Sequence, residues 1–332
     1  MEVNTVAQKY IDDIKETVKK VAPLVVVRCI TYNHKPYIKD TLEGFVMQKT
    51  NFPFIVVVHD DASTDGTPDI IKEYVKSYPD IIKPIYEEEN QHSKKNGSVT
   101  RIMNAACEVT GARYIAMCEG DDYWIDPLKL QKQVDFLESH SDYSLCFHGV
   151  DVLVEGNLKL EENIYRKLEN RTYSPNEILE QWTVPTASAV FRREIIQSLP
   201  KNPKFQFGDN VCWLACASKG KLYGFKDHMA IYRRQSSGWI ARQGSYRSFE
   251  KFARHYEGIM ESFPDLDIPV AKTIVSQDYA ALTYYDLVSF RFRSMWKHIK
   301  AGWNNTKLDY CRWLVKAPIL KVKRILNRMG KK

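Results

Sequence analysis

Three short apolar runs in the N-terminal part of the chain constrain its fold more than any other feature. They are Leu24–Ile30, Phe54–Val58 and Tyr114–Cys118, and each consists mainly of aliphatic residues without a regular polar alternation. Strands of this kind are buried on both faces, as in the centre of a parallel sheet. Helical patterns lie between the runs, so strand and helix alternate. This order predicts a doubly wound, mostly parallel α/β sheet with helices on both faces and right-handed crossovers.

The remaining patterns predict three regions along the chain. An amphipathic helix over residues 1–22 is followed by a catalytic domain over residues 23–240, with a nucleotide-binding half over 23–124 and an acceptor half over 125–240. Residues 241–332 form a helical C-terminal extension that ends in a basic amphipathic tail. Further helices are predicted at 36–48, from Pro68, and at 98–110, 175–181, 209–219, 246–262 and 270–300, with a short strand near 81–86.

Composition and cysteine usage exclude several classes of protein. Hydrophobic residues make up 44% of the 332 residues and charged residues 27%, as in an ordinary globular protein, which argues against disorder and collagen. The seven cysteines are scattered and lack the close pairs of zinc or redox sites, so we expect reduced and mostly buried thiols. Neither a signal peptide nor a long apolar span is recognisable. The expected location is cytoplasmic, with peripheral attachment to the inner face of the membrane.

Three polar clusters follow the three apolar runs. They are Thr31-Tyr-Asn33, His59-Asp-Asp61 with Ser63 and Asp65, and Glu119-Gly-Asp-Asp122. Ligands of open parallel sheets bind outside the carboxyl ends of the strands, which is where these clusters are expected. The three carboxylates between positions 119 and 122 repel one another, and a divalent cation such as Mg²⁺ or Mn²⁺ would relieve that repulsion. A solvated acidic turn is the alternative interpretation, and Asp65 suits a turn or helix cap.

In combination these residues resemble the inverting family 2 nucleotide-sugar glycosyltransferases, which have the fold called GT-A. The resemblance covers roughly residues 23–239 and rests on Thr31-Tyr-Asn33, on Val58-His-Asp-Asp-Ala-Ser-Thr-Asp-Gly-Thr67 and on Glu119-Gly-Asp-Asp122, which stands in the place of the family's D-x-D motif. One departure is Glu119, where Asp is commoner. The fold implied is a Rossmann-like GT-A domain.

The resemblance implies roles for individual residues. It implies a nucleotide site formed by the residues Thr31, Tyr32, Asn33, Asp61, Arg101 and Asp121, and a metal held by Asp122 with Asp121 assisting. The physical chemistry agrees, because a carboxylate accepts the imino N–H of a uracil ring, an aromatic ring stacks on the base, and a divalent ion stabilises a diphosphate leaving group. For Arg101, an ordinary surface arginine is the alternative interpretation.

An inverting transferase also needs a carboxylate that removes the proton of the acceptor hydroxyl. Asp209, in Phe205-Gln-Phe-Gly-Asp-Asn-Val-Cys-Trp213, resembles the acidic element that performs this role in the family. A plain helix N-cap is the alternative for Asp209, and Asp227 is then the next candidate base. Thr186–Arg193 resembles the strand beneath the acceptor site, and Tyr232–Trp239 resembles the segment where relatives carry a Tyr-Arg pair. We expect this segment to form a loop that closes over the donor, with Gly238 as the bend and Trp239 as the cover, and ordinary packing is the alternative for Trp239.

The C-terminal region carries a positive charge larger than the net charge of the whole chain. From Arg291 onward thirteen Lys and Arg stand against Asp309 alone, whereas the whole chain sums to +7. Trp296, Ile299 and Trp303 recur at helical spacing, and further apolar residues alternate with cations after Pro318. This pattern is typical of a helix that lies in an anionic membrane interface. A C-terminal helix packed on the domain is the alternative, and nucleic acid is not an expected partner.

The sequence therefore predicts a metal-dependent glycosyltransferase that moves a hexosyl or N-acetylhexosaminyl group, with inversion, from a nucleotide-diphosphate donor. A UDP-sugar is the favoured donor, and a saccharide or lipid-linked glycan is the expected acceptor, in surface polysaccharide biosynthesis. Two alternatives stay open. A metal-dependent nucleotidyltransferase would show a glycine-rich basic loop after the first strand, which Thr31–Pro36 is not. A non-catalytic basic membrane-binding module would hydrolyse no donor.

Overall fold

A computed structural model describes residues 3–154, 160–161, 164–234 and 246–317 of the chain. The residue contacts divide the chain into two units. The first unit comprises Met1–Ser174, Thr183–Ser198 and Lys219–Gln235, and the second comprises Pro175–Trp182, Leu199–Ser218 and Ser236–Lys332. The division of the sequence into a helix, a catalytic domain and an extension, with boundaries near residues 22 and 240, stays a prediction.

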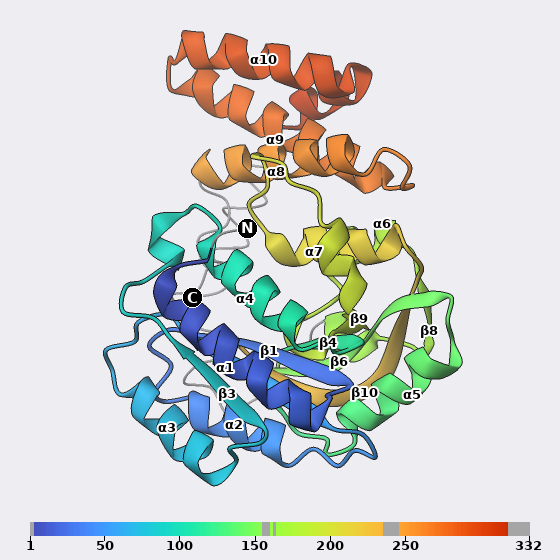
Figure 1. Ribbon diagram of the computed structural model, residues 1–332. Coiled ribbons are helices and arrows are strands. Elements are labelled where there is room, and N and C mark those ends of the chain that lie inside the picture. Colours follow the sequence, from blue (N-terminus) through green and yellow to red (C-terminus); the bar gives the residue numbers. More distant parts are fainter. Residues whose placement is uncertain (1–2, 155–159, 162–163, 235–245, 318–332) are drawn as a thin grey trace. The chain divides into compact units, whose positions relative to one another are not determined.

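The first unit contains a sheet and five α-helices (Figure 1). Its α-helices are α1 (Thr5–Val21), α2 (Ile38–Val46), α3 (Thr67–Ser77), α4 (Ser98–Val109) and α5 (Lys129–Ser139). Its strands are β1 (Val25–Thr31), β2 (Phe54–Asp60), β3 (Ile82–Tyr86), β4 (Tyr114–Met117), β5 (Tyr123–Trp124), β6 (Tyr143–Val154), β7 (Leu160–Glu161), β8 (Arg171–Tyr173), β9 (Val190–Arg192) and β10 (Lys221–Arg234). Short 3₁₀ helices are η1 (His92–Lys94), η2 (Ile164–Lys167), η3 (Thr186–Ser188) and η4 (Arg193–Ser198).

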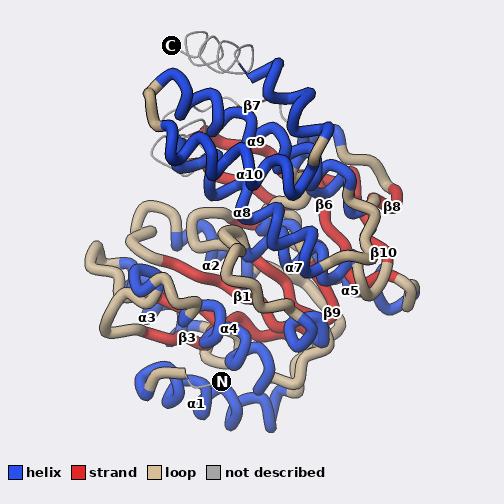
Figure 2. Tube along the Cα trace, turned by 90° about the horizontal axis from the view of Figure 1, so that it is seen from above, coloured by secondary structure: helices blue, strands red, loops and turns tan. Residues whose placement is uncertain are grey.

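The strands form a single layer, which Figure 2 shows from above. The order is β3-β2-β1-β4-β9-β6-β10-β5, with β7 beside β6 and β8 beside β10. Strands β3, β2, β1 and β4 are parallel, as are β6 and β10, whereas β9 runs antiparallel to both β4 and β6. The prediction of a doubly wound, mostly parallel GT-A sheet is confirmed.

Helices cover both faces of this sheet, as its apolar strands require. Val25, Val27 and Cys29 of β1 belong to a core that also contains residues of α2, α3 and α5. Successive strand residues point to opposite faces, so the intervening positions of β1 face α4, which packs together with α1. Burial on both faces explains why the three runs read as continuous apolar segments rather than as alternating ones.

The second unit is helical within the described residues. It contains α6 (Pro175–Gln181), α7 (Gly208–Ala217), α8 (Tyr246–Ser262), α9 (Pro269–Val288), α10 (Phe292–Thr306) and a further helical stretch over residues 308–317. α9 packs against both α8 and α10. The helical pattern over 270–300 is divided into two helices, because Phe290 adopts a left-handed conformation with a φ of 54° that ends α9. The C-terminal helical region is thus confirmed.

The structure bears on the expectations about the cysteines and about membrane-spanning helices. Six of the seven cysteines are buried as free thiols, and Cys311 is exposed. Among the helices that the structure describes, none combines the length and the apolar character needed to cross a membrane. The apolar residues of the basic tail after Pro318, and Gly238 and Trp239, lie outside the described residues.

Candidate active site

The carboxyl ends of three adjacent strands bring the predicted nucleotide-binding residues together. In the sheet, Thr31 at the end of β1 lies beside Asp60 of β2, and Arg28 of β1 lies beside Met117 of β4. The polar clusters that follow these strands therefore begin at one edge of the sheet. Backbone hydrogen bonds continue the pairing into the loops, from Asp61 N to Thr31 O at 3.0 Å and from Gly120 N to Ile30 O at 2.8 Å.

Asn33 joins the loop after β1 to the loop after β2. Its backbone N–H donates to Ser63 Oγ at 2.8 Å, and its side-chain Oδ1 accepts from Thr64 N at 2.9 Å. Asn33 has a φ of 54°, a left-handed conformation that asparagine tolerates better than most residues. Asn33 thus has a structural role in shaping the loop, beside its predicted role toward the nucleotide.

Asp65 is confirmed as a turn residue, and the N-cap position of α3 belongs to Gly66. Its carboxylate accepts from Thr67 N at 3.0 Å and Thr67 Oγ1 at 2.6 Å at the start of α3, and from Lys35 N at 2.9 Å. Burial by itself would raise the pKa of Asp65, but these hydrogen bonds outweigh it and lower that pKa below its ordinary value. The carboxylate therefore stays ionised and ties the first two loops together.

Asp61 is buried, and both of its carboxylate oxygens accept backbone hydrogen bonds. Oδ1 accepts from Gln91 N at 2.7 Å and Oδ2 accepts from His92 N at 3.0 Å, both at the start of η1. A carboxylate oxygen has more than one lone pair, so these bonds leave room for a further donor such as a base N–H. In the structure Asp61 organises the segment after β3, and its contact with a nucleotide stays a prediction.

The acidic loop after β4 passes so close to the first loop that position 120 requires glycine. A Cβ atom on Gly120 would lie 2.6 Å from Thr31 Oγ1 and 3.0 Å from His34 Nδ1. Thr41 of α2 also holds this loop, because its hydroxyl lies 3.0 Å from Gly120 O and 2.7 Å from Asp122 O. The acidic loop is therefore held by two elements that precede it by many residues.

Arg233, near the end of β10, donates hydrogen bonds to both Asp121 and Asp122. Its backbone N–H donates to Asp122 Oδ1 at 2.8 Å, and its guanidinium donates to Asp121 O at 3.0 Å. The same guanidinium pairs with Asp40 of α2 and lies over the ring of Tyr123 at 4.3 Å. One arginine thus connects β10, the acidic loop and α2.

Asp122 is buried, and its surroundings do not fully compensate its negative charge. Burial raises its pKa well above the ordinary value, the neighbouring Asp121 carboxylate adds to the rise, and the hydrogen bond from Arg233 opposes it. A divalent cation at this loop would supply the missing positive charge.

Within the described ranges no group of three or more His, Cys, Asp or Glu could hold a metal ion by itself. The donor set at the acidic loop, two adjacent carboxylates, therefore suits an ion completed by phosphate oxygens and water, which is typical of Mg²⁺ at nucleotide sites.

Two buried polar atoms at the same place lack a partner among the described residues. They are Thr31 Oγ1 and His34 Nδ1, which both border the Gly120 turn. Burial lowers the pKa of His34, although Asp121, Asp65 and Asp60 act in the opposite direction, so the imidazole is neutral at neutral pH. Buried polar groups rarely stay unpaired, so these two atoms fit a site that binds a polar ligand.

Tyr32 and Arg101 are the other predicted nucleotide-binding residues, and they come from the loop after β1 and from α4. Tyr32 is exposed, so its ring face is accessible for stacking. Arg101 lies in the first turn of α4, half-buried, and its guanidinium donates to Asn96 O at 2.5 Å. The helix start is linked to Asp61 through Gln91, whose backbone O accepts from Ser98 Oγ at 3.1 Å.

Asp209 lies in the second unit, whereas the other predicted site residues lie in the first. It is the second residue of α7, and the N-cap position belongs to Phe207, which makes no side-chain capping bond. The half-buried carboxylate accepts from Asn210 N at 2.8 Å. Burial raises the pKa of Asp209 above the ordinary value for aspartate. A raised pKa makes a carboxylate a stronger base, which suits proton abstraction near neutral pH.

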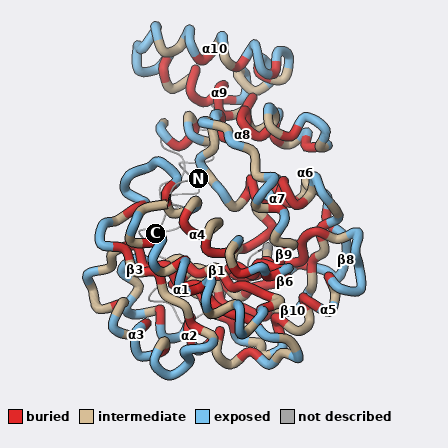
Figure 3. Tube along the Cα trace, viewed as in Figure 1, coloured by how far each residue is buried: buried red, intermediate tan, exposed pale blue. Residues whose placement is uncertain are grey.

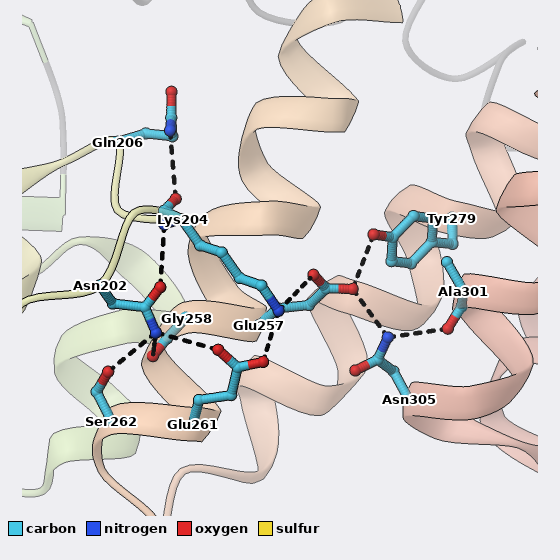
Figure 4. Close-up of polar contacts among 10 residues, drawn as sticks. All are labelled: Asn202, Lys204, Gln206, Glu257, Gly258, Glu261, Ser262, Tyr279, Ala301 and Asn305. Carbon is cyan, nitrogen blue, oxygen red and sulfur yellow. Dashed lines mark hydrogen bonds and ion pairs between the residues drawn. The ribbon is translucent and has the colours of Figure 1, made fainter. Parts of the chain in front are cut away.

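The segment that leads into α7 is anchored by a polar network of the second unit, which Figure 4 shows. Lys204 Nζ lies 3.3 Å from Glu257 Oε2 and 2.5 Å from Glu261 Oε1, both on α8. Glu257 Oε1 in turn accepts from Tyr279 Oη at 2.7 Å and Asn305 Nδ2 at 2.8 Å. The C-terminal helices α8, α9 and α10 therefore fix the segment that carries the predicted base.

Arg233, Thr41 and His34 are site residues that sequence reasoning did not identify. Arg233 stands in the Tyr232-Arg-Arg element, which carried part of the family resemblance, but its bond to Asp122 spans 111 positions. The sequence pattern therefore drew attention to the arginine but did not indicate that Asp122 is its partner. Thr41 and His34 have no local signal at all, because a threonine in a helix and a histidine in a loop are common.

Comparison with known proteins agrees with this geometry. The description Glycosyl transferase family 2 matches residues 27–199, which is more than half of the chain. Rv1520 of Mycobacterium tuberculosis (strain ATCC 25618 / H37Rv), whose name states no activity, is 36% identical over 232 residues, covering 68% of this chain and 63% of that protein. TuaG of Bacillus subtilis (strain 168), named for teichuronic acid biosynthesis, is 29% identical over 238 residues, covering 70% and 89%.

A solved structure extends the likeness to the fold. S. aureus TarS in complex with UDP-GlcNAc has a TM-score of 0.60 at 15% identity, and the alignment covers 90% of this chain and 88% of that chain. The match to the mycobacterial relative spans somewhat less than two thirds of its length. The family match, together with the strand order and the three strand-end loops, shows that the chain belongs to Glycosyl transferase family 2, with the GT-A fold.

Proposed function

We propose that this protein transfers a single sugar, with inversion at the anomeric carbon, from a nucleotide-diphosphate donor to a saccharide or lipid-linked glycan acceptor. The observation that carries the proposal is the buried Asp122, next to Asp121 and held by Arg233, at the strand-end edge where Thr31, Asn33 and Asp61 also lie. A UDP-sugar is the favoured donor, supported by the fold likeness to TarS, which was solved with UDP-GlcNAc. Hexosyl or N-acetylhexosaminyl transfer in surface polysaccharide biosynthesis is the proposed context, supported by the relative TuaG.

The first unit would bind the nucleotide through residues of all three loops. Asp61 would accept the base N–H, Tyr32 would stack on the base, and Asn33 would keep the two loops in register. Asp121 and Asp122 would hold Mg²⁺ or Mn²⁺, which when bound neutralises the charge that develops on the departing diphosphate. Arg101 would add a positive charge near the phosphates.

The chain's own groups would move the one proton that the reaction transfers. The acceptor hydroxyl attacks the anomeric carbon from the side opposite the diphosphate, and the carboxylate of Asp209 takes its proton as the new bond forms. The raised pKa of Asp209 supports this role, because proton transfer is most efficient when the pKa of the base approaches the working pH.

Membrane attachment through residues 291–332 is part of the proposal, because a lipid-linked acceptor is presented at a bilayer. The charge of this segment supports it, with thirteen Lys and Arg against Asp309. Family membership favours glycosyl transfer over nucleotidyl transfer.

The test is a screen of UDP-, GDP- and dTDP-sugars for metal-dependent release of free nucleotide, with UDP binding measured by calorimetry in parallel. We expect release with a UDP-sugar in the presence of Mn²⁺ or Mg²⁺, and we expect Asp122→Asn to lose both release and metal-dependent UDP binding. Glu73→Gln, an exposed carboxylate on α3, is the matched control and should behave as the original protein. Metal-independent UDP binding that Asp122→Asn leaves unchanged would show that the acidic loop is not the metal site.

A further inference from the structure

The helix α10 packs into the second unit with small and polar residues and exposes its aromatic ones. Its buried positions are His298, Gly302 and Thr306, spaced by four residues along one stripe. Its aromatic residues Phe292, Trp296 and Trp303 are exposed by 53%, 65% and 48%. In an ordinary surface helix the apolar stripe faces the core and the polar face meets water. α10 has the reverse arrangement, which Figure 3 shows as mostly exposed positions along this helix.

The contacts on the buried side of α10 are specific, so its orientation is not arbitrary. His298 Nδ1 lies 2.8 Å from Asp286 Oδ2, and Asp286 is fully buried on α9. Gly302 lies so close to the ring of Tyr310 that a Cβ atom would approach it within 2.3 Å. A rotation of α10 that buried its aromatic rings would break both contacts. The rings are therefore held on the outside by the packing of the helix.

The turn between α9 and α10 adds a fourth exposed ring. Phe290 is 79% exposed and sits at the left-handed position that ends α9. The next residue fixes the turn, because Arg291 N donates to Asp286 O at 2.8 Å and its guanidinium lies over the Tyr246 ring at 4.5 Å. The turn thus presents Phe290 from a fixed backbone. Phe290, Phe292, Trp296 and Trp303 are hereafter called the aromatic surface.

Cations border the aromatic surface along one side of α10. At 3.6 residues per turn, the three rings of α10 fall within an arc of about 40°, and Arg293, Lys297 and Lys300 follow at about 60–120° from its centre. All three cations are exposed. Over residues 291–317 seven Lys and Arg stand against Asp309, which lies 3.2 Å from Lys272. An apolar stripe beside a row of cations is the pattern of a helix that lies in a membrane interface.

We propose that the aromatic surface, with Arg293, Lys297 and Lys300, docks on an anionic phospholipid bilayer. The rings enter the boundary between headgroups and acyl chains, and the cations contact the anionic headgroups. The proposal rests on the proposed function, which includes membrane attachment through residues 291–332, and it assigns that attachment to a defined surface that would give access to a lipid-linked acceptor. A second copy of the chain fits less well, because it would bring two rows of cations together.

The test uses the full-length protein and sedimentation with vesicles. Vesicles of phosphatidylglycerol and phosphatidylcholine in equal parts should pellet the protein, and phosphatidylcholine alone should pellet far less of it. The double variant Phe292→Ser with Trp296→Ser should bind the anionic vesicles at least about tenfold more weakly. Arg293→Glu with Lys297→Glu should weaken binding by about fivefold for each cation removed, and high salt should remove the difference.

Two control variants separate docking from a structural effect. Leu128→Ser removes a similarly exposed apolar side chain, 43% exposed, from the first unit and should leave vesicle binding unchanged. Trp296→Phe keeps an aromatic ring and should retain most of the binding, whereas Trp296→Ser should not. Brominated lipid should quench part of the tryptophan emission of the original protein, and Trp296→Phe should lose part of that quenching. All of these positions are exposed, so thermal unfolding midpoints should stay within a few degrees.

Three results would overturn the proposal. One is equal pelleting of the original protein and the double variant. Another is self-association that depends on protein concentration, occurs without vesicle binding and is abolished in the double variant. That result would make the surface a contact between copies of the chain. The third is tight binding of a single-stranded oligonucleotide that anionic vesicles do not compete away. Nucleotide release measured on the same samples is independent of all three, so absence of docking with normal release contradicts the membrane attachment and leaves the proposed sugar transfer standing.

Discussion

Asp61 illustrates how a single residue serves both the fold and the proposed chemistry. Its two carboxylate oxygens accept the N–H groups of Gln91 and His92, and these bonds shape the start of η1 beside the edge where nucleotide binding is proposed. An acidic residue after a strand is a weak signal by itself, since loop aspartates commonly cap turns. The buried position of Asp61 between two strand-end loops gives it a role beyond a turn.

We predict that Asp61→Asn weakens UDP binding by about tenfold or more in the presence of metal. The amide offers one acceptor oxygen instead of two and sets an NH₂ group against a backbone N–H, and a lost hydrogen bond to a charged group costs roughly 1.5–3 kcal/mol. Calorimetry with UDP and Mn²⁺ measures the change, and thermal unfolding separates a lost contact from a loosened segment. Unchanged UDP affinity would remove Asp61 from the nucleotide site.

A single substitution at Asp209 tests the proposed mechanism. We predict that Asp209→Asn reduces sugar transfer by about 10²–10⁴-fold while UDP and metal binding stay close to normal, because the amide keeps the shape but cannot accept a proton at neutral pH. The measurement is turnover with the donor found in the screen, beside calorimetry with UDP. The matched control is Asp265→Asn, an exposed aspartate of the same unit. Near-normal turnover of Asp209→Asn would move the search for the base to other carboxylates such as Asp227.

At the scale of elements, the end of β5 and the start of α5 place a lysine inside the core of the first unit. Lys129 is fully buried, with its Nζ 2.8 Å from Gln133 Oε1 and 4.0 Å from the centre of the Trp124 ring. Gln133 Nε2 in turn donates to Ser188 O at 2.8 Å. This chain of contacts connects β5, α5 and η3 beneath the acidic loop. Burial lowers the pKa of Lys129 to about 7.

We predict that Lys129 makes stability rise with pH above neutrality. Below about pH 7 the folded protein buries an ammonium that the unfolded chain leaves in water, whereas between about 7 and 10 the folded lysine has lost its proton and the unfolded one, with a pKa of about 10.4, keeps it. The unfolded state then binds more protons, so the free energy of unfolding increases with pH. Relative to Lys129→Met, the original protein should gain on the order of a few kcal/mol between pH 7 and 10.

Urea unfolding of the two proteins at several pH values in this range measures the effect. Lys76→Met, which removes an exposed lysine of α3, is the matched control, and its difference from the original protein should stay constant with pH. A constant difference for Lys129→Met as well would mean that the buried lysine keeps an ordinary pKa.

At the scale of the whole molecule, the proposed tasks are divided between two units. The sheet and the nucleotide-binding loops belong to the first unit, and Asp209 and the aromatic surface belong to the second. Charge is also distributed unevenly along the sequence, because Lys and Arg exceed Asp and Glu by twelve from Arg291 onward, while the preceding residues sum to −5. The positive charge is thus concentrated in the C-terminal part of the sequence, for which contact with a bilayer is proposed, and a mildly acidic remainder carries the carboxylate site.

The sequence by itself determined the fold class and the edge of the sheet at which the polar clusters meet. Strands buried on both faces must be continuously apolar, so Leu24–Ile30, Phe54–Val58 and Tyr114–Cys118 could be recognised as parallel strands without any knowledge of their partners. The polar clusters after them then had to meet at one edge, because parallel strands end on the same side of a sheet. Both expectations depend on local pattern alone, and the structure confirms them.

Only the tertiary structure decided which side chains complete the site and which surface of α10 stays exposed. The bond from Arg233 to Asp122 joins residues 111 positions apart, and the fit of Gly120 against Thr31 depends on how two loops approach, so neither leaves a trace in local sequence. The sequence of α10 would equally allow its rings to be buried. They are exposed because Asp286 and Tyr310 bind the opposite stripe of the helix, and such pairings between distant residues are set by packing.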